Sequence, residues 1–196
     1  MSNPFAPRSD ADIVRLVAEN PLAWIVASAD PGRATPMPML LDLDSDGNPI
    51  SVTGHLPRAH PLFETLGSDP RVLLLFQGPH AYISPACLTD KNWAPTWNFA
   101  VAKIAGRIRF DADLTDEALT RLVGHMEGAR AAPWDIAALG QRYETLRARV
   151  IGFRIAIDSI EGRFKLGQDE RPEVFERIVE SLGDDPLADW MRRYSA

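Results

Sequence analysis

The longest regular pattern of apolar and polar positions runs from Pro95 to Phe110 and predicts one long strand. Alternate positions share one face, which carries small or apolar side chains and is expected to face the core: Ala100, Ala102, Ile104, Gly106, Ile108 and Phe110. The opposite face mixes apolar and basic side chains: Phe99, Val101, Lys103, Ala105, Arg107 and Arg109. Two interpretations of this second face stay open: an ordinary barrel surface whose basic side chains reach solvent, or a surface for a ligand or a second subunit.

Five shorter apolar segments also predict strands, at residues 22–28, 35–43, 50–55, 71–77 and 151–157. The polar run from Asp44 to Asn48 is typical of a hairpin turn between the second and third of them. The second segment contains Pro36 and Pro38, which cannot donate ladder hydrogen bonds, so we expect it at a sheet edge or with a bulge. Five or six strands at such short spacing indicate a small barrel.

Helical patterns flank the strands, at residues 9–20, 61–66 and 143–150, after Thr115, and from Pro172 onward. The helix after Thr115 has an apolar stripe that we interpret as core packing: Ala118, Leu119, Leu122, Val123 and Met126. Residues 78–95 are expected to form a long loop, and loops of this length are often functional. The sequence therefore predicts a single domain over residues 1–196, mainly β with peripheral helices (α+β), with a helical C-terminal extension from about residue 170.

Composition narrows the classes of function. The chain has 196 residues and one cysteine, Cys87, so it cannot form an intrachain disulfide. No apolar run approaches the roughly 20 residues that span a bilayer, and the first residues lack the basic and apolar regions of a signal peptide. We therefore expect a cytoplasmic protein without a membrane segment. The net charge of −6 argues against direct nucleic-acid binding, which needs a concentrated basic surface, but a few arginines can still capture a small anion.

Two segments carry candidate binding chemistry. From Thr53 to Pro61 a predicted strand ends in a turn that leads into a helix, whose first N–H groups and dipole favour an anion. Arg58 in this turn adds a guanidinium that can form charge-assisted hydrogen bonds to a phosphate. The alternative interpretation is a tight turn with a solvated arginine. The second segment carries polar side chains that can orient a ligand: Gln77, His80, Tyr82 and Ser84.

Other chemistries find less support in the sequence. The four histidines, at positions 55, 60, 80 and 125, lack the close spacing of a dedicated metal site, so no metal is expected. Cys87 has no His or Asp partner that the sequence makes visible, which favours an inert thiol. Phosphate-binding P-loop, dinucleotide-binding and nucleophile-elbow motifs do not occur. These patterns identify no catalytic residue.

Four segments in one order, at residues 54–61, 76–85, 95–99 and 165–169, resemble the PaiB-type family, known as FMN-binding negative transcriptional regulators. The resemblance spans roughly residues 4 to 182. It implies a split β-barrel of the kind found in flavin reductases and pyridoxamine-phosphate oxidases. It also implies a homodimer with FMN bound in clefts between the subunits. The chain departs from the family pattern at Ala86, Cys87 and Leu88, where two aromatic residues are usual, and at Gly167 and Asp169.

The resemblance also implies roles for individual residues. Arg58, with the turn that contains His60, would contact the FMN phosphate, and Lys165 and Gln168 would reach the site from the partner. The other residues implied by these segments lie beside the ribityl chain or ring, or line the cleft: Thr53, Gly54, His55, Gln77, Trp97 and Asn98. The expected function is that of a PaiB-type regulator without an obvious DNA-binding motif. The alternative is a flavin-dependent oxidoreductase that reduces a small substrate with NAD(P)H.

Overall fold

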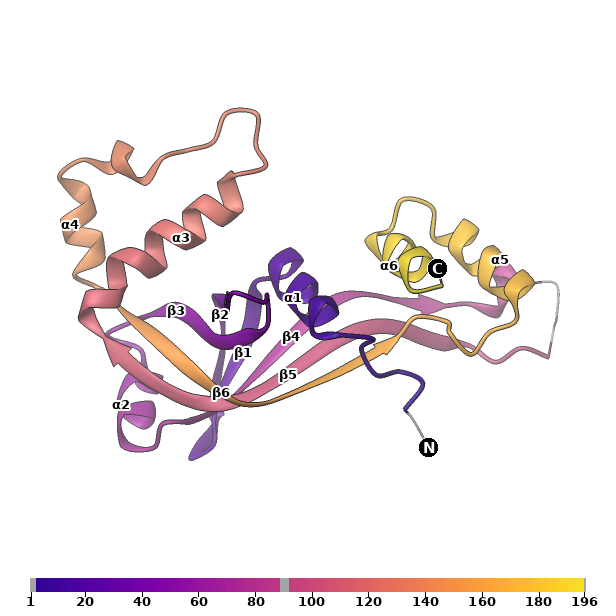
Figure 1. Cartoon of the computed structure of the whole chain (residues 1–196), viewed down its shortest axis with the longest axis horizontal. Coiled ribbons are helices and arrows are strands. Elements are labelled where there is room, and N and C mark those ends of the chain that lie inside the picture. Colours follow the sequence, from indigo (N-terminus) through magenta and orange to yellow (C-terminus); the bar gives the residue numbers. More distant parts are fainter. Residues whose placement is uncertain (1–2, 89–91, 196) are drawn as a thin grey trace.

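The computed structural model describes residues 3–88 and 92–195, and Figure 1 shows how the elements are arranged. In chain order they are α1 (Asp10–Glu19), β1 (Leu22–Ala27), β2 (Asp30–Leu43), β3 (Pro49–Pro57), α2 (Pro61–Ser68), β4 (Arg71–Ile83), η1 (Pro85–Cys87), β5 (Thr96–Asp111), η2 (Ala112–Leu114), α3 (Thr115–Glu127), η3 (Ile136–Leu139), α4 (Arg142–Arg147), β6 (Val150–Lys165), α5 (Pro172–Leu182) and α6 (Pro186–Ser195). No helix within the described residues is long and apolar enough to cross a membrane.

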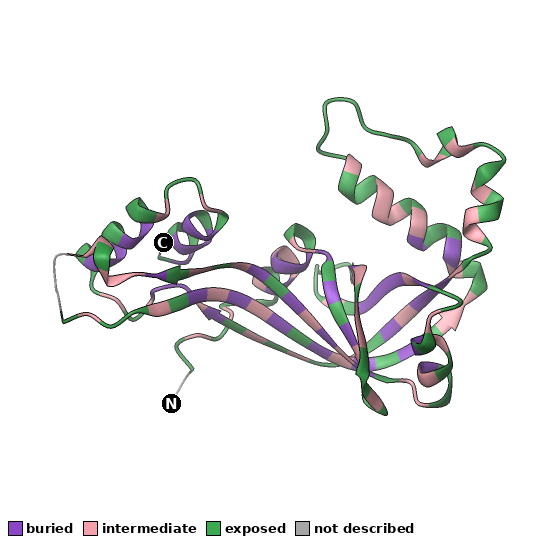
Figure 2. Ribbon diagram, turned by 180° about the vertical axis from the view of Figure 1, so that it is seen from behind, coloured by how far each residue is buried: buried purple, intermediate pink, exposed green. Residues whose placement is uncertain are grey.

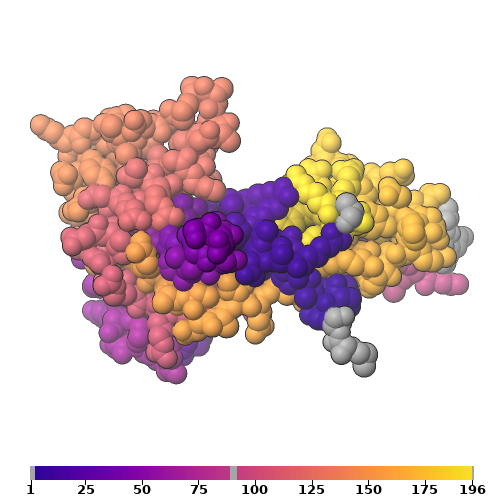
Figure 3. All heavy atoms as spheres, viewed as in Figure 1, coloured from indigo at the N-terminus to yellow at the C-terminus, as the bar shows by residue number. Residues whose placement is uncertain are grey.

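The strands form a closed antiparallel barrel in the order β1-β2-β3-β6-β5-β4, which confirms the predicted α+β class with a barrel at its centre. Three of these strands continue past the barrel. Residues 77–83 of β4 and 157–165 of β6 pair only with β5, because β1 pairs with β4 up to Phe76 and β3 pairs with β6 up to Ala156. This three-stranded extension, which we call the arm, makes the molecule elongated (Figures 1 and 3).

Two predicted boundaries were wrong. The expected loop from residue 78 begins only after Ile83, and β6 runs to Lys165 instead of residue 157. The register of β4 against β5 shifts between Gln77 and His80, so a bulge accommodates the glycine and proline that suggested a loop. The backbone is closely packed at Gly78, where a Cβ would lie 2.3 Å from Leu16 Cδ1 and 3.2 Å from the Ala100 carbonyl oxygen. Part of the expected loop, residues 89–91, lies outside the described residues.

The two prolines of β2 lie in the half of the strand that has one neighbour. Pro36 and Pro38 pair with Trp24 and Leu22 of β1, whereas β3 pairs only with the second half of β2, beginning at Met39. The strand as a whole is internal to the barrel, so the edge prediction is correct only for its proline-containing half. In that half no strand pairs with β2 on its open side, so the N–H groups that the two prolines lack break no ladder hydrogen bond there.

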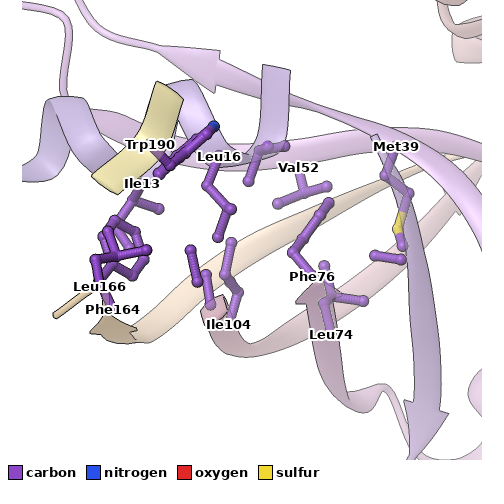
Figure 4. Packing of buried hydrophobic residues seen from close by; sticks show 14 of the residues in the cluster. Ile13, Leu16, Met39, Val52, Leu74, Phe76, Ile104, Phe164, Leu166 and Trp190 are labelled. Carbon is purple, nitrogen blue, oxygen red and sulfur yellow. The ribbon is translucent and has the colours of Figure 1, made fainter. Parts of the chain in front are cut away.

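One face of the sheet forms the core. The predicted inward positions of β5 from Ala100 to Ile108 are all buried, and their side chains join the core cluster in Figure 4 through Ile104. Helix α1 inserts Leu16 into this cluster, and α6 packs Trp190 against Phe164 with ring centroids 5.7 Å apart. Helices α1, α5 and α6 therefore cover the inner side of the barrel mouth and the arm (Figure 1).

The opposite side of β1, β4 and β5, which we call the outer face, is not covered by these helices (Figure 1). Along β4 and β5, buried residues that face the core alternate with more exposed residues that face outward (Figure 2). Its large side chains are unusually exposed: Leu22 is 60%, Trp24 50%, Tyr82 51% and Trp97 52% exposed. Register places Trp24 beside Leu75 and Leu75 beside Lys103, in one row across three strands. The outer face thus presents apolar side chains with basic residues among them, and Lys103 and Arg107 form exposed ion pairs with Glu161 and Asp158. Both interpretations of the β5 pattern are consistent with this surface.

Candidate functional site

The candidate phosphate site is the turn between β3 and α2, residues 57–61, which we call the Arg58 turn. The Arg58 N–H donates to the Arg149 carbonyl (2.9 Å), and the His60 N–H donates to the Pro57 carbonyl (2.9 Å). His60 is the N-cap of α2, where its Nδ1 accepts from the Leu62 N–H (3.2 Å). These backbone donors are therefore already satisfied, and the open set of N–H groups expected from the sequence is not formed. Anion binding at this turn rests on side chains instead.

Two arginines have to be considered at the beginning of α2. Arg33 from β2 donates Nη1 to the Pro61 carbonyl (3.3 Å) and forms an ion pair with Asp30 (2.8 Å). Arg58 is exposed, and its guanidinium makes no hydrogen bond or ion pair within the described part of the chain. Arg58 therefore offers an uncommitted positive charge at the predicted position, while Arg33 is already held by a carboxylate.

The three candidate residues of β3 have different surroundings. Thr53 is buried and donates Oγ1 to Asp42 (2.7 Å). Gly54 faces the barrel interior, because a Cβ at this position would lie 2.6 Å from the ring of Phe153. His55 lies under α3, its Nδ1 is buried without a hydrogen-bond partner in the described chain, and burial lowers its pKa. Of the three, only His55 has a polar atom available for a further contact.

A charged network that the sequence did not reveal surrounds these residues. Asp42 receives a hydrogen bond from Arg121 Nη1 (2.6 Å) across 79 positions of the sequence, and Arg154 Nε lies 3.5 Å from the same carboxylate. Burial raises the pKa of Asp42, but the hydrogen bonds from Ser51, Thr53 and Arg121 outweigh it and hold the pKa below its ordinary value. Asp42 is therefore ionised, and its contacts with Arg121, Arg154 and Thr53 hold α3 against β2, β3 and β6.

The arm carries the aromatic candidates. Trp97 stacks with His80 at a centroid distance of 6.1 Å and meets Tyr82 edge-on at 6.0 Å, and we call these three residues the aromatic cluster. Gln77 Nε2 lies 3.1 Å from His80 Nδ1. Lys165 donates Nζ to Thr96 Oγ1 at the same end of the arm, where β5 and β6 pair. This group offers half-exposed flat rings beside amide and ammonium donors.

Two other candidates point away from the aromatic cluster. Asn98 is 2% exposed on the inner face, where its Nδ2 lies 3.6 Å from Met191 Sδ of α6. Gln168 closes the turn after β6, because its Oε1 accepts from the Leu166 N–H (2.7 Å) and its Nε2 donates to the Phe164 carbonyl. Both amide side chains are committed to holding the C-terminal helices and the arm in place.

The Arg58 turn and the aromatic cluster lie at opposite ends of the molecule. Phe110, near the end of β5, contacts Phe63 of α2 with ring centroids 4.8 Å apart. Trp97 is thirteen positions (110 − 97) earlier in the same strand, so about 43 Å of strand, measured along its path at about 3.3 Å per residue, joins Trp97 to Phe110. One chain therefore does not bring its two candidate groups together.

The sequence of this chain is similar to a known protein family and to a curated protein. Residues 1–159 match a family model described as "Putative FMN-binding domain". The chain is 27% identical over 184 residues to "Protease synthase and sporulation protein PAI 2" of Bacillus subtilis, covering 92% of this chain and 87% of that protein.

Solved structures share the fold at low identity. The FAD and heme binding protein of Mycobacterium smegmatis has a TM-score of 0.61 at 14% identity, with 87% of this chain and 78% of that chain covered. The flavocytochrome Anf3 of Azotobacter vinelandii has a TM-score of 0.57 at 15% identity, with 82% and 69% covered. These similarities confirm the predicted split β-barrel, and the family match confirms the predicted cofactor, FMN.

Proposed function

This chain belongs to the PaiB-type family of FMN-binding proteins, and from that membership we propose that it forms a homodimer with FMN held between the subunits. The family match covers residues 1–159 and so includes both the Arg58 turn and the aromatic cluster. The observation that carries the proposal is that these two groups lie at opposite ends of the molecule, joined by about 43 Å of strand β5. A second copy can supply at each site the group that the first copy holds too far away.

The Arg58 turn suits the phosphate end of FMN. Arg58 is exposed and uncommitted within the described residues, and a guanidinium binds a phosphate through two parallel charge-assisted hydrogen bonds. His60 can add a donor if its ring turns away from the Leu62 N–H, and that turn also frees the N–H for an anion. The chemistry of this end therefore fits a dianionic phosphate.

The aromatic cluster suits the flat ring end. Trp97 and Tyr82 are half exposed, and aromatic faces of this kind pack against planar rings in offset or edge-on arrangements. Gln77 and Lys165 supply donors for ring oxygens and ribityl hydroxyls. When bound, the flavin supplies redox chemistry, and these side chains orient it and limit the access of water.

The outer face is the surface that we expect to form the dimer interface. In a two-fold dimer both subunits use the same patch, so a contact of residue i in one subunit with residue j in the other occurs a second time with the two subunits exchanged. If the two outer faces pack with β5 strands antiparallel, the partner subunit's Trp97 approaches the Arg58 end of the first subunit. Leu22 and Trp24 are large exposed apolar side chains, and Trp24 lies beside the partly exposed Leu75, as expected of a surface that binds a partner.

Replacement of Arg58 tests the phosphate role. We expect Arg58→Ala to weaken FMN binding by about 1–3 kcal/mol, because one charge-assisted contact to the phosphate is lost. Titration of FMN fluorescence or absorbance against the purified protein measures this change. Riboflavin, which lacks the phosphate, should bind wild type and variant with equal affinity.

Arg130→Ala is the matched control, since Arg130 is an exposed arginine that pairs with Glu127 (3.2 Å), the last residue of α3. It should leave the FMN titration unchanged. Equal FMN affinity in wild type and Arg58→Ala would remove Arg58 from the site, and a wild-type protein that takes up no FMN would refute the proposal as a whole.

The flavin site allows two wider roles. We propose a PaiB-type regulatory role in the cytoplasm in which any effect on transcription is indirect, because the net charge of −6 disfavours contact with DNA phosphates. The alternative is an oxidoreductase that passes electrons from NAD(P)H through FMN to a small substrate. Bleaching of the bound flavin by NAD(P)H under anaerobic conditions favours the second role over the first.

A further inference from the structure

A recess separate from the outer face lies between α3, η3, α4 and the barrel, with a volume of about 450 Å³. This helical lobe projects from one end of the barrel (Figures 1 and 3). Aliphatic side chains make up much of its wall: Leu119, Val123, Ile136, Leu139, Leu146 and Val150. A volume of this size lies within the range of about 300–1,000 Å³ that holds small ligands.

The helical lobe lacks a filled core of its own. Thr115 and Ala118 are the buried residues of α3, and none is buried in η3 or α4. The interpretation of the α3 stripe as core packing was therefore wrong for most of its length, because Leu119 and Val123 line the recess. An apolar ligand in the recess would remove these apolar walls from water, which favours binding.

Aromatic side chains on the wall indicate a flat ligand. Trp134 is 44% exposed and lines the recess together with Tyr143. The Tyr143 hydroxyl donates to Asp116 (2.5 Å), and Arg147 Nε pairs with the same carboxylate (2.5 Å). Burial and the bond to Asp116 raise the pKa of Tyr143 to about 12, so its hydroxyl stays protonated and committed. The two aromatic side chains therefore present apolar surface to the recess.

The charge at the recess indicates an acid. Arg147 is neutralised by Asp116, but the Arg149 guanidinium has no hydrogen bond or ion pair among the described residues. Arg149 lines the recess, whose wall is almost wholly apolar, so its side-chain stem forms part of the wall and its exposed guanidinium is available to an acid at the mouth. Its carbonyl accepts from the Arg58 N–H, so the recess adjoins the Arg58 turn while having walls of its own.

We propose that this recess binds a small planar aromatic molecule with one carboxylate, whose ring packs between Trp134 and Tyr143 and whose carboxylate meets Arg149. The site is formed by one chain and does not depend on FMN. The chemical class follows from three features together: apolar walls, aromatic side chains and a single uncommitted guanidinium.

Calorimetric titration with two probes tests the proposal. The probes are 2-naphthoate and the uncharged 2-naphthalenemethanol, each titrated with and without saturating FMN. We expect Arg149→Gln to weaken naphthoate binding about tenfold and to leave the alcohol unchanged, because one charge-assisted contact is lost. Arg142→Gln is the matched control, since Arg142 is exposed on α4 and is not part of the recess wall. It should change neither titration.

A second variant tests the location. Val123→Phe places bulk in the recess and should weaken both probes, with circular dichroism confirming that the variant is folded. The proposal is overturned if wild-type protein binds no naphthoate at millimolar concentration, as it would if a second copy covered the recess. It is also overturned if Arg149→Gln binds both probes as the wild type does. FMN affinity should be the same in wild type and Arg149→Gln, so a failure here is distinct from a failure of the flavin proposal.

Discussion

The variant Trp24→Glu is expected to be a monomer that binds FMN far more weakly than the wild type. Trp24 lies on β1, at one side of the outer face, in the row that contains Leu75 and Lys103, and is half exposed in the single chain. In a two-fold interface each substitution occurs twice, so two carboxylates would be buried without partners. We expect a loss of several kcal/mol in dimer stability, since even one truncated interface anchor can cost about 2 kcal/mol or more.

Ile50→Glu is the matched control, because Ile50 is equally exposed (53%) but lies on β3, away from the outer face. Light scattering should give twice the chain mass of 21.7 kDa for wild type and Ile50→Glu, and a single chain mass for Trp24→Glu. FMN titration of the same samples should show the loss of affinity only in the monomer. A dimeric Trp24→Glu with wild-type FMN affinity would show that the outer face is not the interface.

The second large effect is expected at Gly106, in the bulge between β5 and β6. A Cβ at this position would lie 2.3 Å from the Ala156 carbonyl oxygen and 2.8 Å from Ile155 Cγ2. The oxygen belongs to the backbone of a paired strand and cannot move aside cheaply. We therefore expect Gly106→Ala to lower the free energy of unfolding by about 3 kcal/mol, at the upper end of the usual cost of overpacking.

Gly124→Ala provides the opposite expectation for the same chemical change. Gly124 lies in α3, and a Cβ there has no other atom within 4 Å, so alanine should stabilise the helix by about 0.5–1 kcal/mol. Urea unfolding followed by circular dichroism measures both variants against the wild type. A Gly106→Ala protein as stable as the wild type would contradict the close approach of β5 and β6 at this bulge.

Local sequence patterns predicted the strands and their faces better than their ends. The alternation in β5 correctly placed every second residue from Ala100 to Ile108 on the core side, because successive side chains of a strand point to opposite faces. The end of β4 was missed because Gly78 and Pro79 read as strand breakers, whereas the register shift beside them makes a bulge. A bulge depends on what the neighbouring strand does, and this information is absent from a local pattern.

The candidate site shows the same limit. The motifs identified Arg58 and Trp97, but the distance between them follows from the length and register of β5. The contact of Asp42 with Arg121 joins residues 79 positions apart, and no spacing rule indicates it. For Asn98 a signal was present: it has the same parity as Ala100, so the alternation that predicted the core face also places its side chain there.

Mixing two FMN-deficient variants tests most directly whether each site combines residues of both subunits. Arg58→Ala and Trp97→Ala chains are unfolded together, refolded as a mixture, and titrated with FMN. A mixed dimer then has one site with both replacements and one with neither, so random pairing should restore about a quarter of the wild-type binding capacity. If each subunit instead held its own FMN, every site in the mixture would carry one replacement. No recovery in a mixture shown to contain mixed dimers would contradict the account.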